Sequence, residues 1–95
     1  MVIKFHPDAD AELMDAKNWY EERSKVAARA FGTEVTWAMR RIQEAPGRWK
    51  RHLGGARRFL LPNFPFSIIY RESEETIEIV AVAHYRRRPD YWLER

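Results

Sequence analysis

The chain has 95 residues, which is room for one domain core spanning residues 1–95, and it contains no cysteine for a disulfide or a thiolate metal site. No apolar run approaches the roughly 18 residues that a membrane-spanning helix needs, and acids stand near the N-terminus where a signal peptide is apolar, so we expect a soluble cytoplasmic protein without a membrane partner. The net charge of +3 is uneven, because residues 46–95 hold ten basic and six acidic side chains against seven and eight in residues 1–45.

The first half of the chain predicts a short strand and a helical hairpin. The string VIKF (Val2–Phe5) favours a strand, and the proline and acids that follow it are typical of a helix start. Apolar residues at steps of three and four predict one helix over Pro7–Arg23 and a second that Ser24 caps and that ends before Pro46. Gly32 interrupts the second helix, and we expect it to mark a close contact with the first.

The second half predicts three strands, RRFLL, FPFSIIYR and TIEIVAVAH, with the turn of an antiparallel hairpin at Glu72–Glu75. The last strand is apolar on both faces beyond Glu78, so we expect it to be central, between its hairpin partner and the N-terminal strand. Strict alternation assigns Ile77, Ile79, Ala81 and Ala83 to one face and Glu78, Val80, Val82 and His84 to the other. The expected fold class is α+β: an N-terminal strand, a helical hairpin and then a three-stranded antiparallel sheet, in the order β-α-α-β-β-β.

Two basic blocks lie in the second half, PGRWKRHLGGARR and HYRRR, and such clusters favour a polyanionic partner. The glycine pair Gly54-Gly55 lacks the Lys-Ser/Thr of a phosphate-binding loop, so it predicts a turn. The three histidines, His6, His52 and His84, are scattered along the chain, and no two of them stand at the helical i,i+4 spacing that, with a carboxylate, would form a metal site. We therefore expect no metal site and no cofactor.

Four strings that cover nearly the whole chain carry a family resemblance: AELMDAKNWYEERS, AFGTEVTWAMRRIQEAP, GGARRFLLPNFPFSIIYR and IVAVAHYRRRPDYW. Their order and spacing together resemble the RelE/ParE toxins of bacterial type II toxin–antitoxin systems, which include plasmid stabilisation proteins. The resemblance implies a small toxin that inhibits growth and is neutralised by a cognate antitoxin, a disordered chain that folds on the toxin surface. It leaves open whether two toxins pair as a homodimer.

The resemblance allows two modes of action. RelE-like members cut messenger RNA on the ribosome, and ParE-like members poison DNA gyrase. One nuclease branch uses a His-Tyr pair and a strand arginine, which His84, Tyr85 and Arg58 resemble. In that mode His84 would act as acid or base, Arg58 would hold the phosphate, and Tyr85 would stack on a base or orient the phosphate.

The extension RRRPDYWLER after the His-Tyr pair resembles the ParE side of the family and favours action by binding rather than catalysis. The candidate contacts with target or antitoxin are Arg57, Arg58, Arg86, Arg87, Arg88, Tyr91 and Trp92. Structural roles remain alternatives: His84 as a cap of the strand end, Arg58 as an ion-pair partner of Glu78, and Tyr91-Trp92 as a hydrophobic plug. A third functional class, a non-toxic nucleic-acid- or protein-binding adaptor, also remains open.

Overall fold

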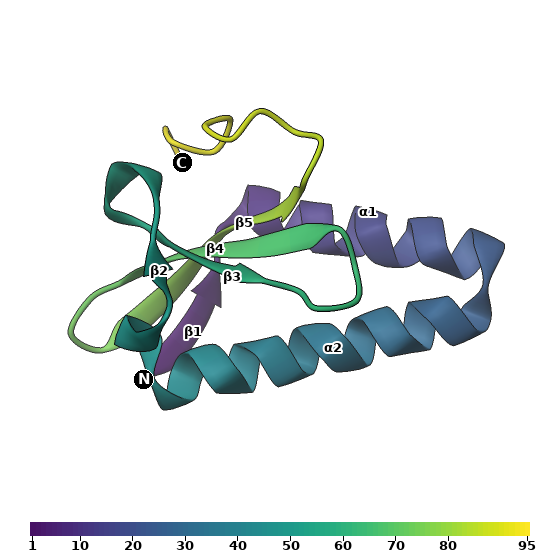
Figure 1. Ribbon diagram of the computed structural model, residues 1–95, viewed down its shortest axis with the longest axis horizontal. Coiled ribbons are helices and arrows are strands. Elements are labelled where there is room, and N and C mark those ends of the chain that lie inside the picture. The colour runs from purple at the N-terminus through teal and green to yellow at the C-terminus, as the bar shows by residue number, and fades with distance from the viewer.

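The computed structural model describes all residues 1–95 and has the α+β fold expected from the sequence. Helices α1 (Pro7–Arg23) and α2 (Lys25–Glu44) form a hairpin along one face of a five-stranded sheet, and the tail, residues 85–95, crosses the other face (Figure 1). The strands are β1 (Val2–Phe5), β2 (Lys50–Arg51), β3 (Arg57–Leu60), β4 (Phe66–Glu72) and β5 (Thr76–His84), with single 3-10 turns at η1 (Pro46–Arg48) and η2 (Leu53–Gly55). No helix has the length and apolar character needed to cross a membrane.

Both helices lie where the sequence predicts them, and side chains cap their first turns. At α1 the Nδ1 atom of His6 accepts the backbone N–H of Asp8 at 3.0 Å, and at α2 the hydroxyl of Ser24 accepts the N–H of Ala27 at 3.1 Å. These contacts satisfy donors that a helix leaves free at its N-terminus. The expectation for Gly32 is wrong, because a Cβ placed there would meet no atom within 4 Å.

The sheet is mixed, with the strand order β1-β5-β4-β3-β2. As predicted, β5 is central between β1 and β4, but β1 runs parallel to β5, so the sheet as a whole is not antiparallel. The connection from β1 to β5 runs through both helices and then through β2, β3 and β4, so it is ample for the crossover that a parallel pair requires. Strand β2 was not predicted, because two residues are too few to show a hydrophobic pattern.

A bulge in β5 changes which side chains share a face. Ala81 lies opposite Ile69 and Ile79 lies opposite Tyr70, so Val80 is an extra residue on β5. Alternation shifts by one residue beyond a bulge. The predicted faces of this strand are therefore wrong beyond Val80.

Each face of the sheet buries its own apolar cluster. The helix-side cluster is the larger and includes Phe31, Ile42, Ile68, Tyr70, Ile77, Ile79 and Val82. The tail-side cluster consists of Ala56, Ile69, Val80, Ala81 and Trp92. Since Val80 and Ala81 both belong to the second cluster, the bulge broadens the apolar surface on which the tail rests.

Candidate functional site

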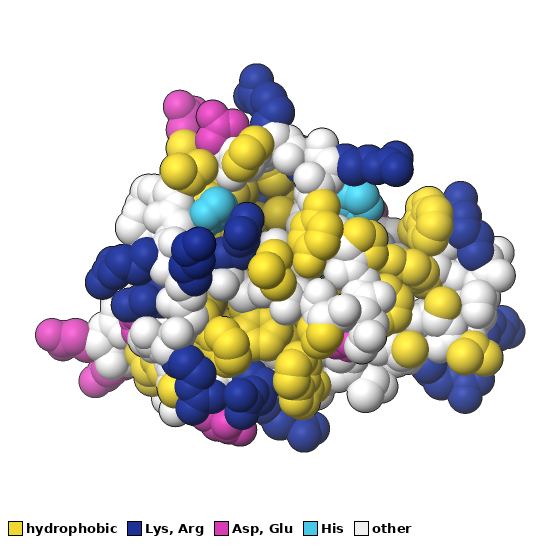
Figure 2. Space-filling model, in the orientation of Figure 1, with side chains coloured by type: hydrophobic (Ala, Val, Ile, Leu, Met, Phe, Trp, Pro, Cys, Tyr) yellow, Lys and Arg dark blue, Asp and Glu magenta, His cyan; other side chains and the backbone are white.

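A hollow of about 300 Å³ lies where β3, β4 and β5 meet the tail, and we call it the cationic hollow. It is lined by His52, Arg58, Leu60, Ser67, Ile69, Ala83, His84, Tyr85, Arg87, Arg88, Pro89 and Trp92. No aspartate or glutamate lines it. Figure 2 shows basic and histidine side chains spread over this face with hydrophobic side chains between them.

The hollow brings together residues from both basic blocks of the sequence. Arg58 lies on β3 opposite Lys50 of β2, so the two side chains share a face of the sheet. Arg87 and Arg88 follow the end of β5 on another side of the hollow. Six of the predicted site residues line this hollow: Arg58, His84, Tyr85, Arg87, Arg88 and Trp92.

His52 also lines the hollow, although sequence reasoning assigned it no role beyond excluding a metal site. Burial lowers the pKa of His52, and the positive charges of Arg58 and Lys50 lower it further. The imidazole is therefore held neutral beside these cations. Its place two residues after Lys50, just beyond the end of β2, is the signal that could have identified it, because side chains two residues apart in extended backbone point to the same side.

Arg57 is a predicted contact residue that the fold itself neutralises. Its Nε atom lies 2.7 Å from a carboxylate oxygen of Glu72, its Nη1 atom donates to the carbonyl of Trp49 at 2.9 Å, and its side chain is 14% exposed. The alternative pairing of Arg58 with Glu78 is wrong, because Glu78 lies opposite Arg71 on β4. Of the two neighbouring arginines Arg57 and Arg58, only Arg57 forms an ion pair, so the charge of Arg58 is free.

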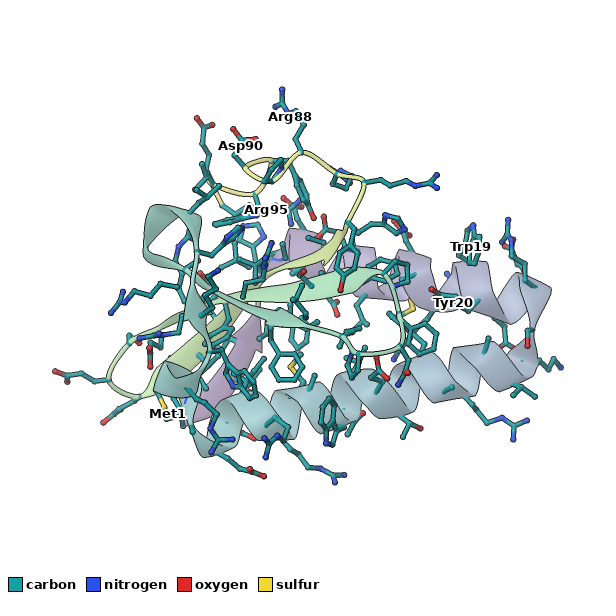
Figure 3. All side chains as sticks on the ribbon, viewed as in Figure 1. Met1, Trp19, Tyr20, Arg88, Asp90 and Arg95 are labelled. Atoms are coloured by element: carbon teal, nitrogen blue, oxygen red, sulfur yellow. The ribbon has the colours of Figure 1, made fainter.

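The three consecutive arginines after β5 are exposed and weakly compensated. Arg88 approaches only Asp90, at 3.9 Å, with 84% of its side chain exposed, and both project outward from the tail in Figure 3. Arg87 has no carboxylate partner, and its guanidinium carbon lies 3.9 Å from the centre of the Tyr91 ring. Arg86 is exposed and does not line the hollow. Exposed pairs of this kind add little stability, so these charges remain available to a partner.

His84 has the structural role that the sequence allowed as one alternative. Its Nδ1 atom accepts the backbone N–H of Arg86 at 3.0 Å, and this contact caps the end of β5. Its ring packs edge-on against Phe66 with centroids 5.0 Å apart. Only the Nε2 atom of His84 remains for contact with a ligand in the hollow.

Trp92 was predicted as a contact with target or antitoxin, but it plugs the tail into the sheet, which is the structural alternative for this residue. It is 1% exposed and belongs to the cluster around Ile69, Val80 and Ala81. The neighbouring Gly54 has a φ of +60°, and a Cβ there would lie 2.7 Å from the Cδ2 atom of Leu93. The predicted turn at Gly54 is thus also the point where the β2–β3 connection meets the tail.

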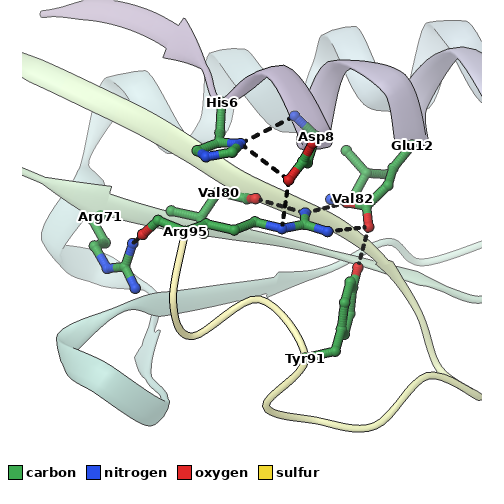
Figure 4. Close-up of polar contacts among 8 residues, drawn as sticks. All are labelled: His6, Asp8, Glu12, Arg71, Val80, Val82, Tyr91 and Arg95. Atoms are coloured by element: carbon green, nitrogen blue, oxygen red, sulfur yellow. Dashed lines mark hydrogen bonds and ion pairs between the residues drawn. The ribbon is translucent and has the colours of Figure 1, made fainter.

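A partly buried polar cluster of Glu12, Tyr91 and Arg95, which we call the Glu12 latch, fixes the other end of the tail, as Figure 4 shows. The carboxylate of Glu12 on α1 accepts two hydrogen bonds from the guanidinium of Arg95, at 2.9 and 3.0 Å, and one from the hydroxyl of Tyr91 at 2.7 Å. It also accepts the N–H of Val82 at 3.0 Å, while Arg95 donates to the carbonyl of Val80 at 3.1 Å. Strand β1 pairs with β5 only as far as Ile79, so the backbone groups of Val80 and Val82 have no strand beside them on that edge. The side chains of Glu12 and Arg95 form the hydrogen bonds that a neighbouring strand would otherwise form.

The Glu12 latch explains two perturbed groups. Burial and the hydrogen bond to Glu12 raise the pKa of Tyr91 well above its ordinary value. The hydrogen bond to Glu12 is also the main reason why the pKa of Arg95 is raised. Tyr91, predicted as a partner contact, is therefore a tail anchor, and Glu12 and Arg95 were not predicted because 83 positions separate them.

A comparison with protein families gives a match over residues 3–89 to the family described as ParE toxin of type II toxin-antitoxin system, parDE. The chain belongs to this family. The family resemblance that the sequence strings carry is therefore confirmed. In this ParE-family chain the matched range contains Arg58 and the three arginines after β5, and it ends before Tyr91 and the latch residue Arg95.

The fold of this ParE-family chain is shared with a solved structure described as "Chromosomal ParDE TA system from P. aeruginosa". The TM-score is 0.77 at 20% sequence identity, and the match covers 88% of this chain and 95% of that chain. At this identity the similarity concerns the fold alone. The comparison with curated proteins found no significant match.

The ParE-family chain has a second concavity, a groove of about 370 Å³ between α1 and the ends of β4 and β5. It shares His84 and Arg87 with the cationic hollow but also contains the carboxylates of Glu12 and Asp15. Trp19 stands at this groove, with the guanidinium carbon of Arg23 3.8 Å from its ring centre (Figure 3). The groove is thus mixed in charge, whereas every charged side chain that lines the hollow is basic.

Proposed function

We propose that this chain is the toxin of a type II toxin–antitoxin pair in the cytoplasm, that a cognate antitoxin neutralises it, and that it acts by binding DNA gyrase. Membership of the ParE family supports the toxin role. The observation that carries action by binding is the cationic hollow with its weakly compensated arginines. A charged surface held on a rigid sheet suits recognition of a large partner.

Neutralisation by the antitoxin has a simple electrostatic form in this proposal. An acidic or amphipathic segment of the antitoxin covers Arg86, Arg87 and Arg88 and denies them to the target. The exposure of these side chains supports this arrangement.

The proposal is tested by inducing the chain in bacteria with and without its antitoxin and by assaying gyrase-dependent DNA cleavage complexes with the purified protein. We expect growth arrest only without antitoxin, and accumulation of cleavage complexes. Replacing Arg86, Arg87 and Arg88 with Glu is expected to abolish both effects while the circular dichroism spectrum stays unchanged.

The matched control reverses three exposed charges on the helices, Lys17, Lys25 and Arg29, and should retain toxicity. Normal growth at high levels of soluble wild-type protein would refute the toxin role. If the protein binds its antitoxin but neither arrests growth nor traps cleavage complexes, it is a non-toxic adaptor.

A ribosome-dependent endoribonuclease is the second candidate, because Arg58, His84 and Tyr85 line the same hollow. Two contacts weigh against it. Trp92 fills the tail side of the sheet beside these residues, and the Nδ1 atom of His84 is occupied by Arg86. In a translating extract this candidate predicts message cleavage that His84→Ala abolishes, so unchanged cleavage by the folded variant removes His84 from the mechanism.

A further inference from the structure

We propose that Lys50 and Arg58, together with Arg87 and Arg88, form a binding site for the phosphodiester backbone of nucleic acid. The inference rests on and deepens the proposed function. A toxin bound to DNA gyrase would also contact the DNA that gyrase holds. The argument comes from the placement of charges in the β2–β3 pair and around the hollow.

The β2–β3 pair places like charges directly opposite each other. Lys50 faces Arg58 and Arg51 faces Arg57 across an antiparallel ladder. Directly opposed side chains of like charge destabilise a sheet, and only Arg57 receives a carboxylate, from Glu72. Lys50, Arg51 and Arg58 form no ion pair within the chain, so a bound polyanion would relieve a repulsion that the free protein bears.

The arginines of the tail continue this positive surface across the sheet. Lys50 lies on β2, and Arg87 lies just beyond the end of β5, three strands away. Neighbouring strands are about 4.8 Å apart, so the row spans on the order of 14 Å. The acid-free lining of the hollow separates it from the neighbouring groove, in which Glu12 and Asp15 would repel an anion.

The density of charge and the aromatic rim favour nucleic acid over an acidic peptide. A nucleic-acid strand carries about one charge per 3.4 Å of helix axis, so roughly four phosphates match a 14 Å row. An extended peptide turns a side chain to one face only every other residue, about 6.7 Å, and presents half as many charges. Tyr85 is 52% exposed beside the hollow, where its ring is free to stack on a base or pack against a sugar.

The direct test is fluorescence anisotropy with the purified full chain and three labelled probes: a 20-base-pair DNA duplex, a 20-nucleotide single strand and a 20-residue polyglutamate. We expect binding to one or both DNA probes with a slope of log K against log salt near roughly −3, from about four neutralised phosphates. The tighter DNA probe identifies whether duplex or single-stranded backbone is the ligand. Polyglutamate should bind at least about tenfold more weakly than that probe.

The double variant Lys50→Gln with Arg58→Gln is expected to lose at least about tenfold in DNA affinity and to flatten the salt slope by roughly 1.5 to 2. Its melting temperature should rise by roughly 1–8 °C, because the opposed charges are gone. The control, Lys17→Gln with Arg29→Gln, removes the same net charge from the exposed helix surface and should lose less than about threefold.

A second readout follows His52 by NMR titration. Bound DNA should raise the pKa of His52, which burial and the charges of Arg58 and Lys50 lower in the free chain. An unchanged His52 titration in the presence of saturating DNA contradicts the site.

Besides an unchanged His52 titration, three results of the binding assays overturn the inference: no DNA binding at 50 mM salt, equal losses in the two double variants, or polyglutamate binding as tight as DNA. Gyrase assays keep this inference separate from the proposed function. If the wild-type chain traps cleavage complexes but binds neither DNA probe, the inference fails and the proposed function stands. If DNA binding holds but no variant or wild-type chain traps complexes, the proposed function fails instead.

Discussion

Replacing Glu12 with Gln tests whether the latch holds the tail on the sheet. The carboxylate accepts four hydrogen bonds, and the side chains of Glu12 and Arg95 are 16% and 15% exposed. Removing one partner of a buried ion pair costs about 3–5 kcal/mol, and the partial exposure of this pair places the expected loss lower, at about 2–3 kcal/mol. For a chain of this size that corresponds to a fall in melting temperature of roughly 10–20 °C.

The assay is urea unfolding followed by tryptophan fluorescence, with trypsin cleavage within the tail as a local probe. Glu12→Gln should unfold at lower urea, and its tail should be cut faster after Arg86 and Arg87 because Arg95 no longer anchors it. Asp15→Asn is the control, since Asp15 lies on the same helix without an ion pair. A loss below about 0.5 kcal/mol in Glu12→Gln, or an equal loss in Asp15→Asn, would refute the latch.

Two further changes probe the contact between loop and tail and the buried tyrosine. Gly55→Ala should cost about 1 kcal/mol for its positive φ, and Gly54→Ala should cost more in urea unfolding because Leu93 must also move; equal losses would show that the tail does not rest on Gly54. Burial raises the pKa of Tyr70 from 10.0 to about 12, and its hydroxyl donates to the carbonyl of Pro46. The neutral phenol therefore stabilises the fold fully below pH 10, and up to roughly 3 kcal/mol should be lost as the pH rises through 12. Tyr70→Phe should show a smaller alkaline loss in unfolding experiments at pH 9 and pH 11, and an undiminished loss would contradict this assignment.

Much of the fold was predictable because local patterns carry it. The 3.6-residue spacing of apolar side chains and the cap at Ser24 locate α1 and α2 within a residue or two, and the β-branched runs locate β4 and β5. The basic blocks likewise indicated the charged side of the molecule. The three consecutive arginines after β5, Arg86, Arg87 and Arg88, are indeed exposed.

The face of β5 could not be predicted, because a bulge depends on the register with β4. Val80 is apolar like its neighbours, so nothing in its side chain signals that it is the extra residue. The consequence reaches the site, since the bulge turns Ala81 toward Trp92. Strict alternation fails wherever one residue is inserted.

The sequence by itself determined both helices, every strand except β2, the order of these elements, the family and the basic character of the second half, because these depend on residues near one another in the chain. Only the tertiary structure decided which arginines stay free. Glu72 forms an ion pair with Arg57 and leaves Arg58 unpaired. Glu12, near the N-terminus, forms an ion pair with Arg95 at the C-terminus. Ion pairing depends on distances of a few ångströms across strands and helices, and such distances exist only once the chain has folded.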